Sequence, residues 1–169
     1  MIEVLDDFIT PSYHRELLDY VGSNRVEWFY QENISKRQGI PQLGMQGFSH
    51  MLIHHDDYIQ QSPLKSLVMP LLFQIQDYLK SPKILRARLD MTLYHPTPLE
   101  HQPHIDMDGP HYSAVYYVND SDGDTIINDT RVCPKANRVV VFDGTIVHNG
   151  MSPSYHPNRI IINSNYDVW

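Results

Sequence analysis

The stretch "ILRARLDMTLY" (residues 84–94) alternates between apolar and polar residues, as an extended strand with two different faces does. One face carries Leu85, Ala87, Leu89, Met91 and Leu93. The other face carries Arg86, Arg88, Asp90, Thr92 and Tyr94. The apolar face suits packing against helices. The polar face is either solvated, which is the simpler interpretation when the strand is taken alone, or turned toward a functional site.

Two helices are predicted upstream of this strand. "TPSYHRELLDYVG" (10–22) has Thr10 as a cap, Pro11 at the first helical position and Gly22 as the stop. "SPLKSLVMPLLFQIQDYL" (62–79) repeats its apolar residues at helical spacing after the cap and proline of Ser62 and Pro63. Pro70 lies inside that pattern, so a kink or break is expected near Met69.

Several further strands are predicted around these elements: "VEWFY" (26–30), "HYSAVYYVND" (111–120), "TIIND" (125–129), "NRVVVF" (137–142), "TIVH" (145–148) and "NRIIINSNY" (158–166). Asp143-Gly144 predicts a two-residue hairpin that folds "TIVH" back against "VVVF". The segment 31–48 is rich in Gly and Gln and predicts a long loop or irregular hairpin that covers a site. Helices followed by strands indicate an α+β, mainly β fold with helices on one side of an antiparallel sheet assembly.

Composition limits the classes of function. The chain has 169 residues, long enough for one domain with a real core, and a formal net charge of −7. This charge argues against a nucleic-acid surface, which needs clustered Lys and Arg. No apolar run reaches about 18 residues, so no membrane span is expected. A single cysteine, Cys133, suits a reducing compartment and predicts a small buried side chain, and the acidic N-terminus lacks the basic region of a signal peptide. We therefore expect a soluble, cytoplasmic protein.

The motif "HIDMD" (104–108) places two metal-binding side chains two residues apart. On a strand, His104 and Asp106 point to the same side and can hold one ion together. A lone motif of this kind is weak, and the chain has 10 histidines. His148, which ends the predicted "TIVH" strand, is the best third ligand. Two histidines and one carboxylate on one face of an octahedron form the arrangement of non-haem Fe(II) sites, which leaves positions open.

Arg159 follows His148 by eleven residues and opens the apolar run "RIIIN". A guanidinium offers a planar fork that binds a carboxylate at two points, so arginine in such a strand suits a carboxylate ligand. Taken alone, Arg159 is better explained as a surface charge on an edge strand.

Together these parts resemble the Fe(II)/2-oxoglutarate-dependent oxygenases, and specifically their prolyl-hydroxylase-like branch, over about residues 86–166. Tyr94 lies ten residues before the H-x-D motif, where oxygen-sensing prolyl hydroxylases carry a tyrosine. "YYVND" resembles the family's "YLN" strand, and "DGDT" (122–125) resembles its Gly-Gly-x-Thr segment, with Asp124 in place of the second glycine. "CPKANRVVVFDGTIVHNG" (133–150) resembles the run that leads to the distal histidine.

The resemblance implies a double-stranded β-helix, or jelly-roll, with N-terminal helices buttressing one sheet. It implies one domain over 1–169, with helical support over about 1–82 and a jelly-roll core over about 83–169. Fe(II) would be held by His104, Asp106 and His148. The cosubstrates would be 2-oxoglutarate and O2, with ascorbate as a candidate reductant. Arg159, assisted by Tyr94 and Tyr116, would bind the far carboxylate of 2-oxoglutarate. Many members have Ser or Thr two residues after the arginine, where this chain has Ile161, and Asn163 on the same strand face would substitute as a donor.

Three functions remain open at this point. The first is a hydroxylase that releases succinate and CO2, with a prolyl residue in a peptide or protein as the best substrate and a free amino acid or other metabolite as the alternative. The second is a cupin-like metal or small-ligand binding protein without oxygenase activity, which would not need a carboxylate clamp. The third is an inactive interaction domain, which would be expected to have lost a metal ligand. The sequence does not indicate an oligomeric state.

Weaker candidates lie outside the main motif. "HHDD" (54–57) could bind a metal, but such runs are usually solvated. His101 and His111 flank the H-x-D motif and could support the ligands or touch substrate. Arg37, Arg86 and Arg88 could meet an acidic substrate group, although surface salt bridges are the simpler role for each.

Overall fold

The computed structural model describes residues 1–34, 44–54 and 62–168, and it contains two antiparallel sheets and two helices. The larger sheet has seven strands in the order β1-β9-β6-β11-β4-β3-β2. These strands are β1 (Ile2–Leu5), β9 (Arg138–Asp143), β6 (Tyr112–Tyr117), β11 (Asn158–Tyr166), β4 (Ile84–Leu93), β3 (Gly47–Ile53) and β2 (Phe29–Gln31). All neighbouring pairs are antiparallel.

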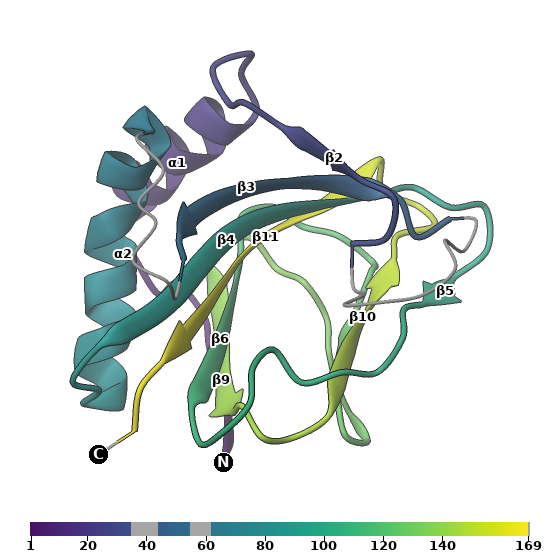
Figure 1. The fold of residues 1–169 in the computed structure, drawn as a ribbon. Coiled ribbons are helices and arrows are strands. Elements are labelled where there is room, and N and C mark those ends of the chain that lie inside the picture. Colours follow the sequence, from purple (N-terminus) through teal and green to yellow (C-terminus); the bar gives the residue numbers. More distant parts are fainter. Residues whose placement is uncertain (35–43, 55–61, 169) are drawn as a thin grey trace.

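The smaller sheet has four strands in the order β5-β10-β7-β8, which are β5 (Leu99–Glu100), β10 (His148–Ser152), β7 (Thr125–Ile127) and β8 (Thr130–Val132). It lies across from the larger sheet (Figure 1). A small apolar core joins the two sheets, and includes Tyr117 and Ile161 from the larger sheet with Ile127 and Val132 from the smaller one. This is the jelly-roll arrangement that the resemblance predicted.

The helices α1 (Pro11–Val21) and α2 (Pro63–Leu79) cover the outer face of the larger sheet (Figure 1). Their buried residues, such as Leu17 and Leu72, pack with Leu89 of β4 and Ile162 of β11 in the main core. The helices therefore buttress one sheet, as predicted.

The helix α2 continues through Pro70, so the predicted break does not occur. The hydroxyl of Tyr13 donates to the Leu67 carbonyl at 2.6 Å and accepts from the Leu71 amide at 3.1 Å. These two backbone groups are the partners that one helical hydrogen bond would join. A side chain of α1 thus satisfies the backbone of α2 immediately after its proline.

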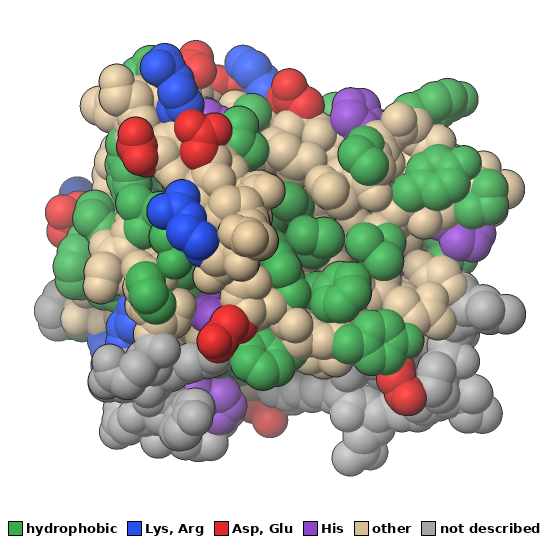
Figure 2. Space-filling view, turned by 90° about the horizontal axis from the view of Figure 1, so that it is seen from above, with side chains coloured by type: hydrophobic (Ala, Val, Ile, Leu, Met, Phe, Trp, Pro, Cys, Tyr) green, Lys and Arg blue, Asp and Glu red, His purple; other side chains and the backbone are tan. Residues whose placement is uncertain are grey.

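The β2 edge of the larger sheet carries exposed apolar side chains. Phe29 and Tyr30 of the edge strand β2 are 50% and 60% exposed, and the Tyr30 ring packs edge-on against Phe48 of β3. Hydrophobic side chains are visible across this face in Figure 2.

The path of the chain differs from the sequence prediction around His148 and in the N-terminal region. "TIVH" is not a strand: Asp143-Gly144 turns the chain out of the larger sheet, and His148 opens β10 in the smaller one. The predicted hairpin is therefore wrong, because β9 pairs with β1 and β6 rather than with the segment that follows it. The N-terminal region also supplies three strands to the larger sheet, so it is more than helical support.

Candidate metal and cosubstrate site

The described residues contain one group of side chains suited to a metal ion, and it is the predicted one. His104, Asp106 and His148 each offer a ligand atom, and these atoms lie within 4.8 Å of one another. His104 and His148 are brought together by an isolated antiparallel bridge, in which each backbone amide donates to the other residue's carbonyl at 2.9 Å.

Both imidazoles are oriented for metal binding by hydrogen bonds to the chain itself. His104 Nδ1 lies 3.0 Å from the Gln102 carbonyl, and His148 Nδ1 lies 3.0 Å from the Ile146 carbonyl. Because a carbonyl only accepts, each Nδ1 must carry the proton, and in the neutral ring Nε2 then keeps a free lone pair. Both Nε2 atoms face Asp106, at 4.0 Å and 3.6 Å from its carboxylate oxygens. The donor set therefore fits a divalent transition metal.

Four side chains from the larger sheet hold the carboxylate of Asp106. Arg86 Nη1 donates to Oδ1 at 3.3 Å, and Asn165 Nδ2 donates to Oδ2 at 3.0 Å. Asn163 Nδ2 lies 3.2 Å and 3.3 Å from the two oxygens, and Ser113 Oγ donates at 3.4 Å. Asn163 thus lies in the site, but its amide nitrogen donates to the carboxylate of the metal ligand Asp106 and not toward the predicted 2-oxoglutarate position.

Charge interactions within the triad favour a cation between its members. Burial alone would raise the pKa of Asp106, but His148 and Arg86 hold this pKa well below its usual range. Burial likewise opposes protonation of His148, but Asp106 beside it raises the pKa of that imidazole. The pKa of His104 is lowered by burial and by the neighbouring His148. A metal ion would compete with protons for the imidazole and carboxylate groups of the triad, so metal binding must depend on pH.

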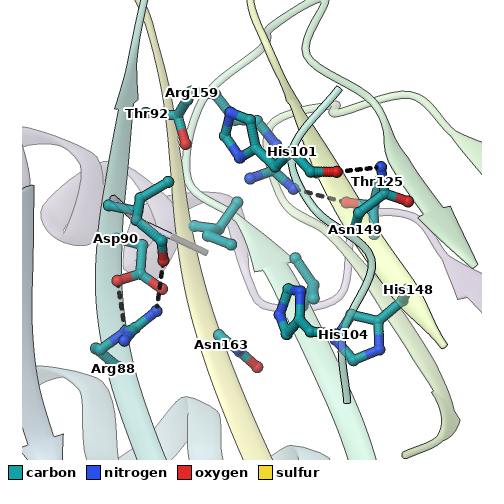
Figure 3. Close-up of a pocket in the computed structure, with 14 residues that line it drawn as sticks. Arg88, Asp90, Thr92, His101, His104, Thr125, His148, Asn149, Arg159 and Asn163 are labelled. Carbon is teal, nitrogen blue, oxygen red and sulfur yellow. Dashed lines mark hydrogen bonds and ion pairs between the residues drawn. The ribbon is translucent and has the colours of Figure 1, made fainter. Parts of the chain in front are cut away.

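A pocket extends from the triad between the two sheets (Figure 3). Its lining is mostly polar and comprises Ile34, Arg88, Asp90, Thr92, His101, His104, Val115, Thr125, His148, Asn149, Gly150, Arg159, Ile161 and Asn163. The polar face of β4 therefore lines the pocket, which is the second of the two interpretations that the alternation of residues 84–94 left open.

Arg159 is buried in this pocket, with 4% of its surface exposed. Its Nη2 donates to Thr125 Oγ1 at 2.7 Å, and this oxygen also accepts from the Tyr117 hydroxyl at 2.7 Å. Within the described residues, Nε has no hydrogen-bond partner. Gly150 leaves room beside the guanidinium, since an added Cβ would lie 3.4 Å from Nη1. A buried arginine with donors to spare suits a carboxylate ligand, and a surface role for Arg159 is excluded.

The structure does not bring Tyr94 and Tyr116 to this pocket. Tyr94 follows the last residue of β4 and is 53% exposed. Tyr116 points to the helix side of β6, where its hydroxyl lies 2.7 Å from His14 Nδ1 and donates to Asn137 Oδ1 at 3.1 Å. Tyr117, one residue on, faces Arg159 instead. A shift of one residue on a strand exchanges the two faces, which is why matching "YYVND" at Tyr116 selected the wrong side.

Thr125 and His101 are further residues of the site. Thr125 ends the "DGDT" segment and contacts Arg159, while Asp124, in place of the second family glycine, lies 3.8 Å from Arg131. His101 is 4% exposed and lies 3.0 Å from Ser152 Oγ through Nε2. Burial, followed by the charge of Arg159, lowers the pKa of His101 to about 3, so this imidazole is neutral.

Of the weaker candidates, Arg88 lines the pocket and Arg86 holds Asp106. Residues 55–57 of "HHDD" and residues 35–43 of the predicted cover, which include Arg37, lie outside the described residues. Cys133 is exposed, contrary to the prediction of a buried side chain. Partial burial, followed by Asp124, raises the pKa of its thiol and disfavours a thiolate. In the described part of the chain, neither helix has the length and hydrophobicity needed to cross a membrane.

Comparisons with solved structures identify the fold. The chain is similar to a prolyl hydroxylase from Trichoplax adhaerens in complex with a hypoxia inducible factor peptide (TM-score 0.68, 12% identity, 98% of this chain and 83% of that one). It is also similar to a prolyl-4-hydroxylase from Pseudomonas putida (TM-score 0.63, 15% identity, 99% of this chain and 92% of that one). A third similar structure is HygX from Streptomyces hygroscopicus with nickel and 2-oxoglutarate bound (TM-score 0.61, 12% identity, 98% of this chain and 82% of that one). HygX has also been solved with hygromycin B bound.

No family model matches the sequence, and no curated protein matches it either. At these identities the likeness concerns the fold. The chain has the jelly-roll fold of the Fe(II)/2-oxoglutarate oxygenases, in the form found in prolyl hydroxylases.

Proposed function

We propose that the protein is an Fe(II)- and 2-oxoglutarate-dependent dioxygenase that hydroxylates its substrate and releases succinate and CO2. The observation that carries this proposal is the pairing, in one pocket, of a two-histidine, one-carboxylate triad with the buried Arg159. The fold, which is that of the 2-oxoglutarate oxygenases, supports it.

The residues divide the work between two ends of the pocket. His104, Asp106 and His148 would hold Fe(II) and leave three coordination positions open. Arg159, aligned by Thr125 and Tyr117, would pair with the far carboxylate of 2-oxoglutarate. When bound, Fe(II) with 2-oxoglutarate and O2 supplies the oxidising chemistry, with ascorbate as a candidate reductant. The chain orients these groups, and the buried pocket walls exclude water from them.

For the substrate, we favour a prolyl residue in a peptide or protein, supported by the two prolyl hydroxylases among the similar structures. A small molecule is the second candidate, because HygX has been solved with hygromycin B. The expected reducing, cytoplasmic setting is compatible with the single cysteine and would keep iron in its ferrous state.

The competing proposal is a cupin-like protein that holds a metal or small ligand without oxidising anything. Arg159 argues against this function. It is buried in the pocket, with 4% of its surface exposed, and a barrel that only binds a metal has no need for such an arginine. An inactive interaction domain is the weakest candidate, because all three ligands are present and close together.

Anaerobic titration of the Fe(II)-loaded protein with 2-oxoglutarate tests the proposal. We expect a weak visible charge-transfer band that saturates with 2-oxoglutarate and is absent in Asp106→Ala, which should lose the metal and all turnover. Iron that stays bound without such a band would contradict the proposal and favour the cupin-like protein.

A further inference from the structure

The pocket and the adjoining metal triad together contain three arginines and two aspartates among the described residues. These are Arg86, Arg88 and Arg159, together with Asp90 and Asp106. With neutral histidines as metal ligands, this leaves one positive charge in excess. Fe(II) and the 2-oxoglutarate dianion of the proposed function cancel each other, so the excess persists in the loaded enzyme. An excess of one positive charge in a partly buried site is costly, and an anionic ligand would offset it.

Each of the three arginines has an anionic partner in the loaded enzyme. Arg86 pairs with Asp106 at 3.3 Å, and its side chain is 14% exposed. Arg88 pairs with Asp90 at 2.6 Å. Arg159 is the proposed partner of the cosubstrate. Of the three, Arg88 lines the pocket and has donors that its aspartate does not use, so it is the candidate for the additional anion.

Arg88 uses one side of its guanidinium for Asp90. Its Nε lies 2.6 Å from Asp90 Oδ1 and forms an ion pair with it. Its Nη2 makes a long contact of 3.4 Å to the Ile34 carbonyl. Nη1 has no hydrogen bond within the described part of the chain. The side chain is 22% exposed, against 14% for Arg86, so a ligand can reach it.

The position of Arg88 places it beside the reacting end of the pocket. In the register of the larger sheet it lies opposite Asn163, which donates to Asp106, and Figure 3 shows its guanidinium on the pocket wall formed by β4. The side chain of His104 is 31% exposed and that of His148 only 6%, so the accessible flank of the metal site is the His104 flank.

We propose that Arg88 binds a carboxylate of the substrate, and hence that the substrate is an acid carrying this group close to the carbon that is hydroxylated. This inference rests on the proposed function and narrows its substrate class. A planar guanidinium with free N–H groups can receive a carboxylate at two points, which a neutral group of the same shape cannot match. The carboxylate can belong to a free amino acid or to an acidic residue beside the target in a peptide.

Acetate and its neutral isostere acetamide are suitable probes. The protein is loaded with Mn(II) and saturating 2-oxoglutarate, so that no turnover occurs and Arg159 is occupied, and its melting temperature is followed at constant ionic strength. A ligand that binds only the native state raises this temperature. We expect acetate to stabilise the protein and acetamide not to, with the acetate affinity at least tenfold weaker in Arg88→Gln and partly retained in Arg88→Lys.

Arg131→Gln is the matched control, because Arg131 is a 53% exposed arginine that pairs with Glu100 at the surface. This variant should respond to acetate as the wild type does. Equal responses to acetate and acetamide, or an unchanged acetate response in Arg88→Gln, would overturn the inference. Failure of 2-oxoglutarate itself to stabilise the Mn(II)-loaded wild type would instead count against the proposed function.

The source of the carboxylate is assigned by two further probes in the same assay. Free L-proline is compared with L-prolinamide, and a blocked Pro-Glu peptide is compared with its Pro-Gln counterpart. Stabilisation that depends on the acid and on Arg88 supports the inference for whichever pair shows it. If both members of each pair stabilise the protein equally and independently of Arg88, substrate binding does not use this arginine and the inference is wrong.

Discussion

The two faces of the seven-stranded sheet are built from the same strands but serve different purposes. Toward the helices, Leu89 of β4, Tyr116 of β6 and Ile162 of β11 lie in the main core. Toward the smaller sheet, neighbouring residues of the same strands, among them Asp90 and Asn163, line the pocket. One face thus supplies stability and the other supplies chemistry, and the two are separated by a single residue along the chain.

One substitution on each face, at Leu89 and at Arg159, should separate the two faces most strongly. Leu89→Ala removes a fully buried side chain and should lower the free energy of unfolding by about 2–5 kcal/mol, with the 2-oxoglutarate affinity of the folded protein unchanged. Arg159→Met should do the opposite, weakening 2-oxoglutarate binding by about 2–5 kcal/mol because it removes the partner of a buried charge, while metal binding is kept. Denaturant unfolding and calorimetric titration of the Mn(II)-loaded proteins measure the two quantities.

The exposed Arg131→Met serves as the control for Arg159→Met and should leave the affinity intact. Unchanged 2-oxoglutarate affinity in Arg159→Met would show that the carboxylate clamp has been assigned to the wrong residue.

The pocket face should also make stability depend on pH through His101. Its folded pKa of about 3 lies below the ordinary value of 6.5, so between these values the unfolded chain binds more protons than the native one. The stability contributed by neutral His101 is present above pH 6.5 and is lost as the pH falls, by about 1.4 kcal/mol per pH unit.

His101→Gln removes this titration, and a glutamine can still hydrogen-bond with Ser152. In metal-free protein, the free energy of unfolding of the wild type should therefore fall more steeply between pH 6.5 and 5 than that of His101→Gln. Parallel pH profiles for the two proteins would mean that His101 is protonated in the native state.

Local patterns and the family resemblance predicted much of this arrangement. The alternation in residues 84–94 predicted an apolar and a polar face for β4, and the resemblance carried by His104, Asp106, His148 and Arg159 predicted the metal triad and the carboxylate-binding arginine. The support for Asp106 could not be predicted, because Ser113 and Asn165 lie on different strands and meet the carboxylate only through the sheet register. The path around His148 was predicted wrongly, since a turn such as Asp143-Gly144 does not reveal whether the chain returns to the same sheet.

Two adjacent tyrosines give the finest test of the comparison. Tyr116→Phe removes hydrogen bonds to His14 and Asn137 on the helix face, and should lower the free energy of unfolding by about 1 kcal/mol without changing 2-oxoglutarate affinity. Tyr117→Phe removes the donor to Thr125, the residue that aligns Arg159, and should weaken 2-oxoglutarate binding by about 1 kcal/mol. Each variant is the control for the other, because both delete one hydroxyl from β6. A loss of affinity in Tyr116→Phe but not in Tyr117→Phe would mean that the cosubstrate contact lies on the face that the family resemblance first suggested.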